Sequence, residues 1–101
     1  MDIKELEEEF MKSNWPKTDK ILSDVVKLPY EEAKEIFIKG LKAKRHGIRT
    51  ASIKGLVSFN RAETVDIIRP FLGDPSYETR IEAKNAIIKI TGEDVKTSKG
   101  E

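Results

Sequence analysis

The stretch GIRTASIKGLVSFN, residues 47–60, places an arginine, small residues and large apolar residues at spacings that recur later in the chain. When the sequence is slid along itself until Arg49 meets Arg80, Leu56 falls on Ile87. This alignment, which we call the repeat register, matches further pairs: Ser52 with Ala83, Gly55 with Ala86, Phe59 with Ile90, Ile36 with Ile67, and Leu41 with Leu72. Self-similarity at a period of roughly 20–50 residues is typical of repeat architectures. The chain of 101 residues therefore reads as one domain of repeated units.

A second shift of the same length, toward the N-terminus, reaches a unit that keeps only the large apolar positions. There Thr18 stands at the position of Arg49, and Ile21 stands at the position of Ser52. Terminal units of repeat proteins are often atypical, so we read this one as a degenerate first unit. We expect units at about 1–29, 30–61 and 62–93, followed by a flexible polar tail at 94–101.

Helical periodicity runs through the chain, and no segment alternates apolar and polar residues over the length of a strand. The spacing predicts helices at about 3–11, 18–28, 29–45 and 48–59, with Asp2 capping the first and Gly47 ending the third. Asn60 is expected to cap a fifth helix that Pro70 bends. Asp74 is expected to cap a sixth helix that Gly92 ends.

The small residues of the repeat predict close helix packing. Ser52, Gly55, Ala83 and Ala86 would let neighbouring helices approach, while Leu56 and Ile87 would fill the layer between them. One pair of helices cannot bury its apolar face alone, so stacked pairs are expected to share one continuous core.

The segment AETVDIIRPFLGDPSYETRIEAKNAIIKITG, residues 62–92, combines a first helix with a late proline, Gly-Asp at the turn, Arg-x-x-Ala-x-x-Ala-Ile and a closing Thr-Gly. These features resemble the HEAT-like repeats, most closely here and less closely over 31–61. The resemblance implies an all-α solenoid of about three antiparallel helix pairs that acts as a binding scaffold. Members of that family bind proteins mostly, and some are DNA-binding repair glycosylases. The family pattern carries no catalytic residues.

The resemblance also implies a role for Arg49 and Arg80, which open the second helix of their units. In HEAT-like repeats such an arginine packs against the preceding unit and pairs with an acid in the turn. The alternative for both arginines is direct contact with a ligand.

Composition excludes several classes of protein. Charged residues make up 37% of the chain and hydrophobic residues 38%, which fits neither a disordered chain nor a membrane protein. Cysteine is absent, so disulfides, thiolate metal sites and cysteine nucleophiles are excluded. The N-terminal residues are acidic and lack the basic-then-apolar order of a signal peptide. We expect a cytoplasmic location.

No catalytic or metal-binding constellation stands out. His46 is the only histidine and has no acidic residue within ten positions, so we interpret it as a turn residue near a helix end, where a cation is favourable. The acidic cluster at residues 5–9 is interpreted as a solvated helix face, and the serines have no histidine base at a suitable spacing. Trp15 is expected at the edge of the core, with a stacking platform as the alternative. We therefore expect a protein that is not an enzyme and that uses no cofactor or metal.

A basic middle section is the sharper functional signal. No acidic residue occurs between Glu35 and Glu63, whereas this interval holds seven cations: Lys39, Lys42, Lys44, Arg45, Arg49, Lys54 and Arg61. A helix C-terminus favours cations and accounts for the three at 42–45, but not for all seven.

In a HEAT-like stack, one set of repeat-equivalent positions would line the concave surface. These positions are Lys27, Lys54, Ser58, Asn85 and Lys89. Together with Lys42, Lys44 and Arg45 they are the predicted partner-binding residues. A mildly basic concave surface would be complementary in charge to an acidic protein segment or to a phosphate backbone. A net charge of +1 and an aromatic content of 7% weigh against nucleic acid.

We therefore expect a non-catalytic protein-interaction scaffold with an acidic partner. The alternative is a nucleic-acid-binding module that uses the basic middle unit. The oligomeric state and the identity of the partner stay open.

Overall fold

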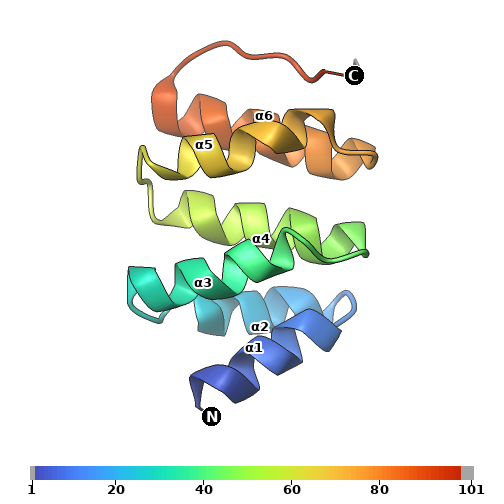
Figure 1. Ribbon diagram of the computed structural model, residues 1–101, viewed down its shortest axis with the longest axis vertical. Helices are drawn as coiled ribbons and strands as arrows, with labels where there is room; N and C mark the ends of the chain where they lie inside the picture. Colours follow the sequence, from blue (N-terminus) through green and yellow to red (C-terminus); the bar gives the residue numbers. More distant parts are fainter. Residues whose placement is uncertain (1, 99–101) are drawn as a thin grey trace.

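The computed structural model describes residues 2–98, and these residues are all-helical with no strand (Figure 1). The predicted all-α class is confirmed. The elements are α1 (Ile3–Lys12), α2 (Lys17–Val25), α3 (Tyr30–Gly40), α4 (His46–Ser58), α5 (Thr64–Ile68), the 3₁₀ helix η1 (Arg69–Gly73) and α6 (Tyr77–Thr91). None of the helices among the described residues has both the length and the apolar character that crossing a membrane requires.

The helices form a compact globule of 39 × 24 × 18 Å, in which successive helices run antiparallel and stack along the long axis (Figure 1). The first layer contains α1, α3, α5 and η1, and the second contains α2, α4 and α6. Helix α4 lies at the centre and packs against α2, α3 and α6. Because α2, α4 and α6 all begin at the right-hand end of Figure 1, their N-termini share one edge of the molecule.

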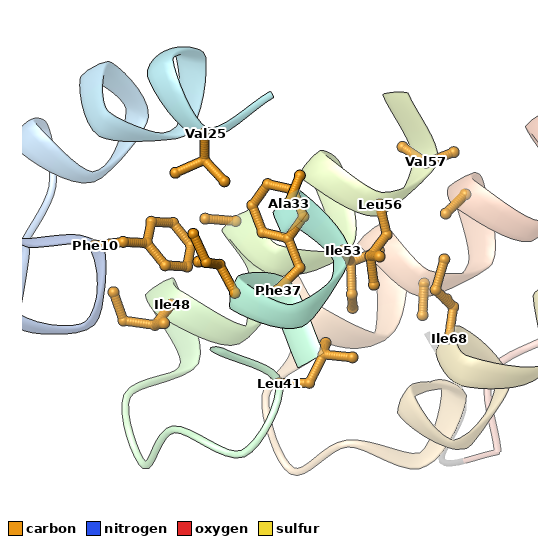
Figure 2. Close-up of a cluster of buried hydrophobic side chains, with 14 of the residues drawn as sticks. Phe10, Val25, Ala33, Phe37, Leu41, Ile48, Ile53, Leu56, Val57 and Ile68 are labelled. Carbon is orange, nitrogen blue, oxygen red and sulfur yellow. The ribbon is translucent and has the colours of Figure 1, made fainter. Parts of the chain in front are cut away.

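One hydrophobic core joins the two layers. Figure 2 shows Phe37 of α3 between Phe10 of α1 and Leu56 of α4. The rings of Phe10 and Phe37 meet edge to face with centroids 5.8 Å apart, a favoured aromatic geometry. Leu56 and its repeat equivalent Ile87 are both fully buried, so the positions that the repeat marks as central lie in the core.

Small residues bring α3 and α4 close together. A β-carbon placed on Gly55 would overlap the ring of Phe37, and one placed on Gly40 would overlap the hydroxyl of Ser52. Phe37 and Ser52 are fully buried, so neither can move aside into solvent. By contrast, a β-carbon on Gly47 at the start of α4 would meet nothing within 4 Å.

Replacing Gly55 with leucine should therefore lower the free energy of unfolding, on the order of 1–3 kcal/mol, because the new side chain overpacks against Phe37. Gly47→Leu is the matched control in the same helix and should not destabilise, since its site is open. Urea unfolding of both variants measures the difference. If Gly55→Leu were as stable as the native chain, the close approach of α3 and α4 would be refuted.

Several predicted helix boundaries are wrong. Helix α3 ends at Gly40 and α4 begins at His46, so Gly47 lies inside α4 and does not end α3. The Arg49 guanidinium closes the intervening turn by donating to the carbonyl oxygens of Ala43 and Lys44, at 3.0 and 2.7 Å. Hydrogen bonds to a side chain thus replace those of a continuing helix.

Two predicted N-caps are also wrong, whereas two helix-end predictions are confirmed. Asn60 has φ 51°, and this left-handed residue follows α4 instead of capping α5. Asp74 does not cap α6, which begins at Tyr77 after Ser76. The Asp2 side chain accepts a hydrogen bond from the Glu5 amide at 2.8 Å and caps α1 as predicted. Gly92, with φ 76°, ends α6 as predicted.

Pro70 coincides with a change of helix type. Helix α5 ends at Ile68 and continues as η1, with Pro70 in the first turn of the 3₁₀ segment. Proline cannot donate the hydrogen bond that an α-helix needs there, which explains the change.

The chain after α6 runs back over η1. The amide of Ser98 donates to the carbonyl oxygen of Leu72 at 2.8 Å, and Thr97 is buried. The predicted polar tail therefore lies against the protein as far as Ser98. The rest of that tail, 99–101, lies outside the described residues.

Candidate functional site

The turns at the edge shared by the starts of α2, α4 and α6 are tied together by arginines. Arg49 forms a bidentate ion pair with Asp74, with Nε 2.9 Å from Oδ2 and a terminal nitrogen 3.0 Å from Oδ1. The Arg80 guanidinium donates to the carbonyl oxygens of Asp74 and Pro75. In the repeat register these two carbonyls are equivalent to the two that Arg49 contacts, so the hydrogen bonds repeat with the sequence.

The Arg49–Asp74 pair is largely buried, with side chains 13% and 4% exposed. Burial of the Asp74 carboxyl would raise its pKa, but hydrogen bonds from Arg49 and the Ser76 amide, and the charges of Arg49 and Arg80, outweigh it and lower the pKa. Both arginines are thus engaged within the protein and hold turns. The acid that Arg49 contacts, Asp74, lies in the turn of the following unit, between η1 and α6.

Other cations of the basic middle section are engaged in the same way. Lys39 forms an ion pair with Glu7 at 3.0 Å, and the Arg61 guanidinium lies 4.2 Å from the centre of the Tyr30 ring. Arg45 donates to Asn14 Oδ1 and, at 2.9 Å, to the carbonyl oxygen of Met11. Much of the positive charge that has no nearby acid in the sequence is therefore paired in the structure with carboxylates or carbonyl oxygens of other units.

We call the exposed surface of α2, α4 and α6 the second-helix face. Four predicted partner-binding residues lie on or beside it and are exposed: Lys54, Ser58, Asn85 and Lys89. Lys27 follows α2, is exposed, and lies 4.0 Å from Asp24. The remaining three, Lys42, Lys44 and Arg45, lie in the turn between α3 and α4. The predicted partner-binding residues therefore lie in two places, the second-helix face and the turn between α3 and α4.

A hollow of about 440 Å³ opens on the second-helix face. Residues at or near the starts of all three helices line it, among them Asp19, His46, Gly47 and Glu78, and Lys54 lines it from farther along α4. A second hollow of about 340 Å³ adjoins it at the turn before α4, where Lys44 and Arg45 contribute. Trp15 lines both hollows.

Glu82 gives the face a further electrostatic feature. Burial of this carboxyl raises its pKa, and the positive charge of Lys54 lowers it by a smaller amount. A partner that brings positive charge to this carboxyl would stabilise its ionised form.

Trp15 and His46 differ from their predicted roles. Trp15 is 79% exposed, so its placement at the edge of the core is wrong. His46 is the first residue of α4, at the end of the helix where the dipole does not favour a cation, and its Nδ1 lies 3.7 Å from a carboxylate oxygen of Glu78. Tyr77, the first residue of α6, is 54% exposed, and sequence reasoning misses it.

The repeat register contains the missing signal. It aligns Trp15 with His46 and His46 with Tyr77. An alignment of the units that relies on identical or apolar residues does not detect this set, because Trp15, His46 and Tyr77 are three different residue types.

No family model, curated protein or solved structure matches this chain.

Proposed function

We propose that this protein is a non-catalytic protein-interaction module, built as a short HEAT-like α-solenoid of three antiparallel helix pairs, that binds its partner through the second-helix face. The observation that carries the proposal is that equivalent positions of the three units lie exposed on neighbouring helices of that face. The equivalent positions Ser23, Lys54 and Asn85 are exposed on α2, α4 and α6, which pack next to one another, and Lys54 lines the hollow of about 440 Å³.

The packing supports the solenoid interpretation. Helix α4 packs on α2 before it in the chain and on α6 after it, within one layer. The hydrogen bonds from Arg49 and Arg80 to repeat-equivalent carbonyls give units two and three the same turn structure. In such an array the faces of successive units add to one extended binding surface.

The charges of the face favour an acidic surface on the partner. Lys27, Lys54 and Lys89 are exposed beside it, and complementary charge accelerates encounter. Nucleic acid is the second candidate, because Lys42 and Lys44 add exposed positive charge at the neighbouring turn. The ion pairs of Lys39 and Arg49 weigh against it, because each of these cations is already paired with a carboxylate of the protein.

Charge reversal tests this proposal. The double variant Lys54→Glu/Lys89→Glu should keep the fold, because surface substitutions usually change stability within about ±0.5 kcal/mol. It should slow association with the partner by about tenfold or more at low salt, and by less at high salt. The matched control is Lys4→Glu/Arg69→Glu, which reverses two exposed charges in the first layer.

The partner is first captured from an extract of the native organism, with and without nuclease, and association rates are then measured at two salt concentrations. Equal rates for the native and reversed proteins would remove these lysines from the site and move attention to Lys42 and Lys44. Capture lost on nuclease treatment, with a steep salt dependence, would favour the nucleic-acid candidate.

A further inference from the structure

Arg80 repeats only part of the contacts that Arg49 makes. In both arginines the terminal nitrogen Nη1 donates to two consecutive carbonyl oxygens of the turn, at 3.0 and 2.7 Å for Arg49 and at 2.8 and 3.2 Å for Arg80. Arg49 also donates from Nε to the Asp74 carboxylate at 2.9 Å. The Nε of Arg80 is buried and has no hydrogen-bond partner among the described residues. A buried donor without an acceptor is costly, so the equivalent arginine indicates what is missing at Arg80, a carboxylate.

The arginine and its carboxylate occur together in the repeat register. Unit one has neither, because Thr18 stands at the position of the arginine and Ala43 stands at the position of Asp74. Arg49 of unit two receives its carboxylate from the turn of the unit stacked after it. By the same rule, Arg80 would receive a carboxylate from the turn of a helix pair stacked on α6, and no further helix follows α6 among the described residues.

The flank of α6 on which such a helix pair would stack is largely apolar. Thr50 marks the flank of α4 that faces α6, because its hydroxyl oxygen lies 2.9 Å from that of Thr79. Val57 follows Thr50 by about two helical turns, so it lies on the same flank, and it is buried. The equivalent residues of α6, Ile81 and Ile88, are only partly buried. A helix stacked on unit three would cover them.

The charges of this end of the protein do not favour a second copy of the chain as the occupant. Lys12 is the residue of unit one that is equivalent to Asp74. If unit one of a second copy stacked on unit three in the repeat register, Lys12 would therefore face Arg80. Lys84 places another cation on the same flank of α6, at the position of the buried Ile53. Like charges brought together at an interface cost free energy, so the charges favour a different protein that presents a carboxylate.

The guanidinium of Arg80 lies at the surface of the end unit. Arg80 is only partly buried, and its Cζ lies 5.7 Å from the centre of the exposed Tyr77 ring, which helps to hold it in place. The segment after α6 reaches the same turn, where the Ser98 amide donates to the Leu72 carbonyl oxygen. A carboxylate that reaches the buried Nε requires its cover to move, and this non-helical segment is a neighbour that can move without breaking a helix.

We propose that Arg80 binds an aspartate in the interhelical turn of a helical protein partner, which stacks on α6 as unit three stacks on unit two. The bound carboxylate would take the bidentate geometry of the Arg49–Asp74 pair. This proposal rests on the proposed function as a HEAT-like interaction module and adds a second binding surface, at the end of the stack.

The test uses the full chain labelled with nitrogen-15 and follows the Nε–H signals of Arg80 and Arg49 by NMR. The probe is the capped peptide Gly-Asp-Pro-Ser, which copies the native turn at 73–76, and the controls are Gly-Asn-Pro-Ser and inorganic phosphate. We expect the aspartate peptide to shift the Arg80 signal and to bind at least about tenfold more tightly than either control. The Arg49 signal should not move, because its Nε already donates to Asp74. An unmoved Arg80 signal, or an equal response to phosphate, would overturn the proposal.

Substitution of Arg80 locates the binding. Arg80→Lys keeps the positive charge but removes the planar fork that a carboxylate engages with two hydrogen bonds. It should weaken binding of the aspartate peptide by about tenfold, measured from the backbone amide signals of residues 76–80. Arg69→Lys, at an exposed arginine of η1, is the matched control and should leave binding unchanged. Circular dichroism checks that both variants are folded. Peptide binding that survives Arg80→Lys would remove this arginine from the site.

Two further outcomes separate this inference from the proposed function. A dimer of the chain that Arg80→Lys disrupts in analytical ultracentrifugation would assign the site to a second copy and overturn the inference. A natural partner whose capture depends on Lys54 and Lys89 but not on Arg80 would also overturn it, and would leave the second-helix face as the binding surface. A partner that depends on Arg80 alone would support the inference and remove the second-helix face.

Discussion

Replacing Asp74 with alanine should lower the free energy of unfolding by about 3–5 kcal/mol, because it leaves the buried guanidinium of Arg49 without its carboxylate. Asp74 accepts three hydrogen bonds, two from Arg49 and one from the Ser76 amide, and all three would be lost. A loss of this size is a large part of the ~5–15 kcal/mol that stabilises a typical domain.

Denaturant unfolding measures the loss, and Asp66→Ala, an exposed carboxylate on α5, is the control with little expected effect. The double variant Arg49→Met/Asp74→Leu separates charge from packing. It removes both charges, so it should be more stable than Asp74→Ala alone. A double variant that is no better than the single one would show that the ion pair is not the cause.

The same pair predicts how stability depends on pH. The pKa of Asp74 is lower in the folded protein than in the unfolded chain, where it is about 3.9. The stabilisation is therefore complete above about pH 4 and is lost as the pH falls through the lower folded value. In urea unfolding at a series of pH values, the difference between the native protein and Asp74→Asn should shrink below about pH 4. A constant difference would contradict this linkage.

Sequence reasoning succeeds where the signal is repetition of apolar and small residues. The repeat register alone places Leu56, Ile87 and Gly55 in the core, and all three are buried. Such positions are predictable because burial and close packing act on each helix in the same way, whatever the neighbouring sequence.

The predicted helix boundaries are wrong where a side chain from a distant part of the chain determines the local conformation. The turn at 41–45 has no strong breaker, so the helical pattern of the sequence continues through it. Arg49 closes this turn by bonding two of its carbonyls, and Asp74, far along the chain from Arg49, fixes the guanidinium. The Asp74 carboxylate accepts hydrogen bonds from Arg49 and from the Ser76 amide, so it holds the turn before α6 and does not act as the N-cap of that helix. Long-range contacts of this kind leave no local pattern.

The prediction of the candidate site is wrong in part for a related reason. Net charge along the sequence makes the middle unit look like a binding patch, but Lys39 and Arg49 pair with acids of other units. The sequence predicts Trp15 at the core because aromatic residues are usually buried, and only the three-dimensional arrangement reveals that the ring is 79% exposed beside a hollow.

Truncating the central core positions is the second large effect that we expect. Leu56→Ala and Ile87→Ala should each lower the free energy of unfolding by about 2–5 kcal/mol, because each side chain is fully buried and the surrounding residues cannot fully close the cavity. The two residues occupy equivalent positions of units two and three, so their losses should be similar. Val26, only partly buried at the end of α2, is the control, and Val26→Ala should cost less.

Urea and thermal unfolding of the three variants give the comparison. In a shared core, both truncations should destabilise the whole domain in a single transition, whereas independent units would unfold in separate steps. Little change for Leu56→Ala and Ile87→Ala would refute the repeat register. A separate early transition confined to Ile87→Ala would instead show that unit three unfolds independently of units one and two.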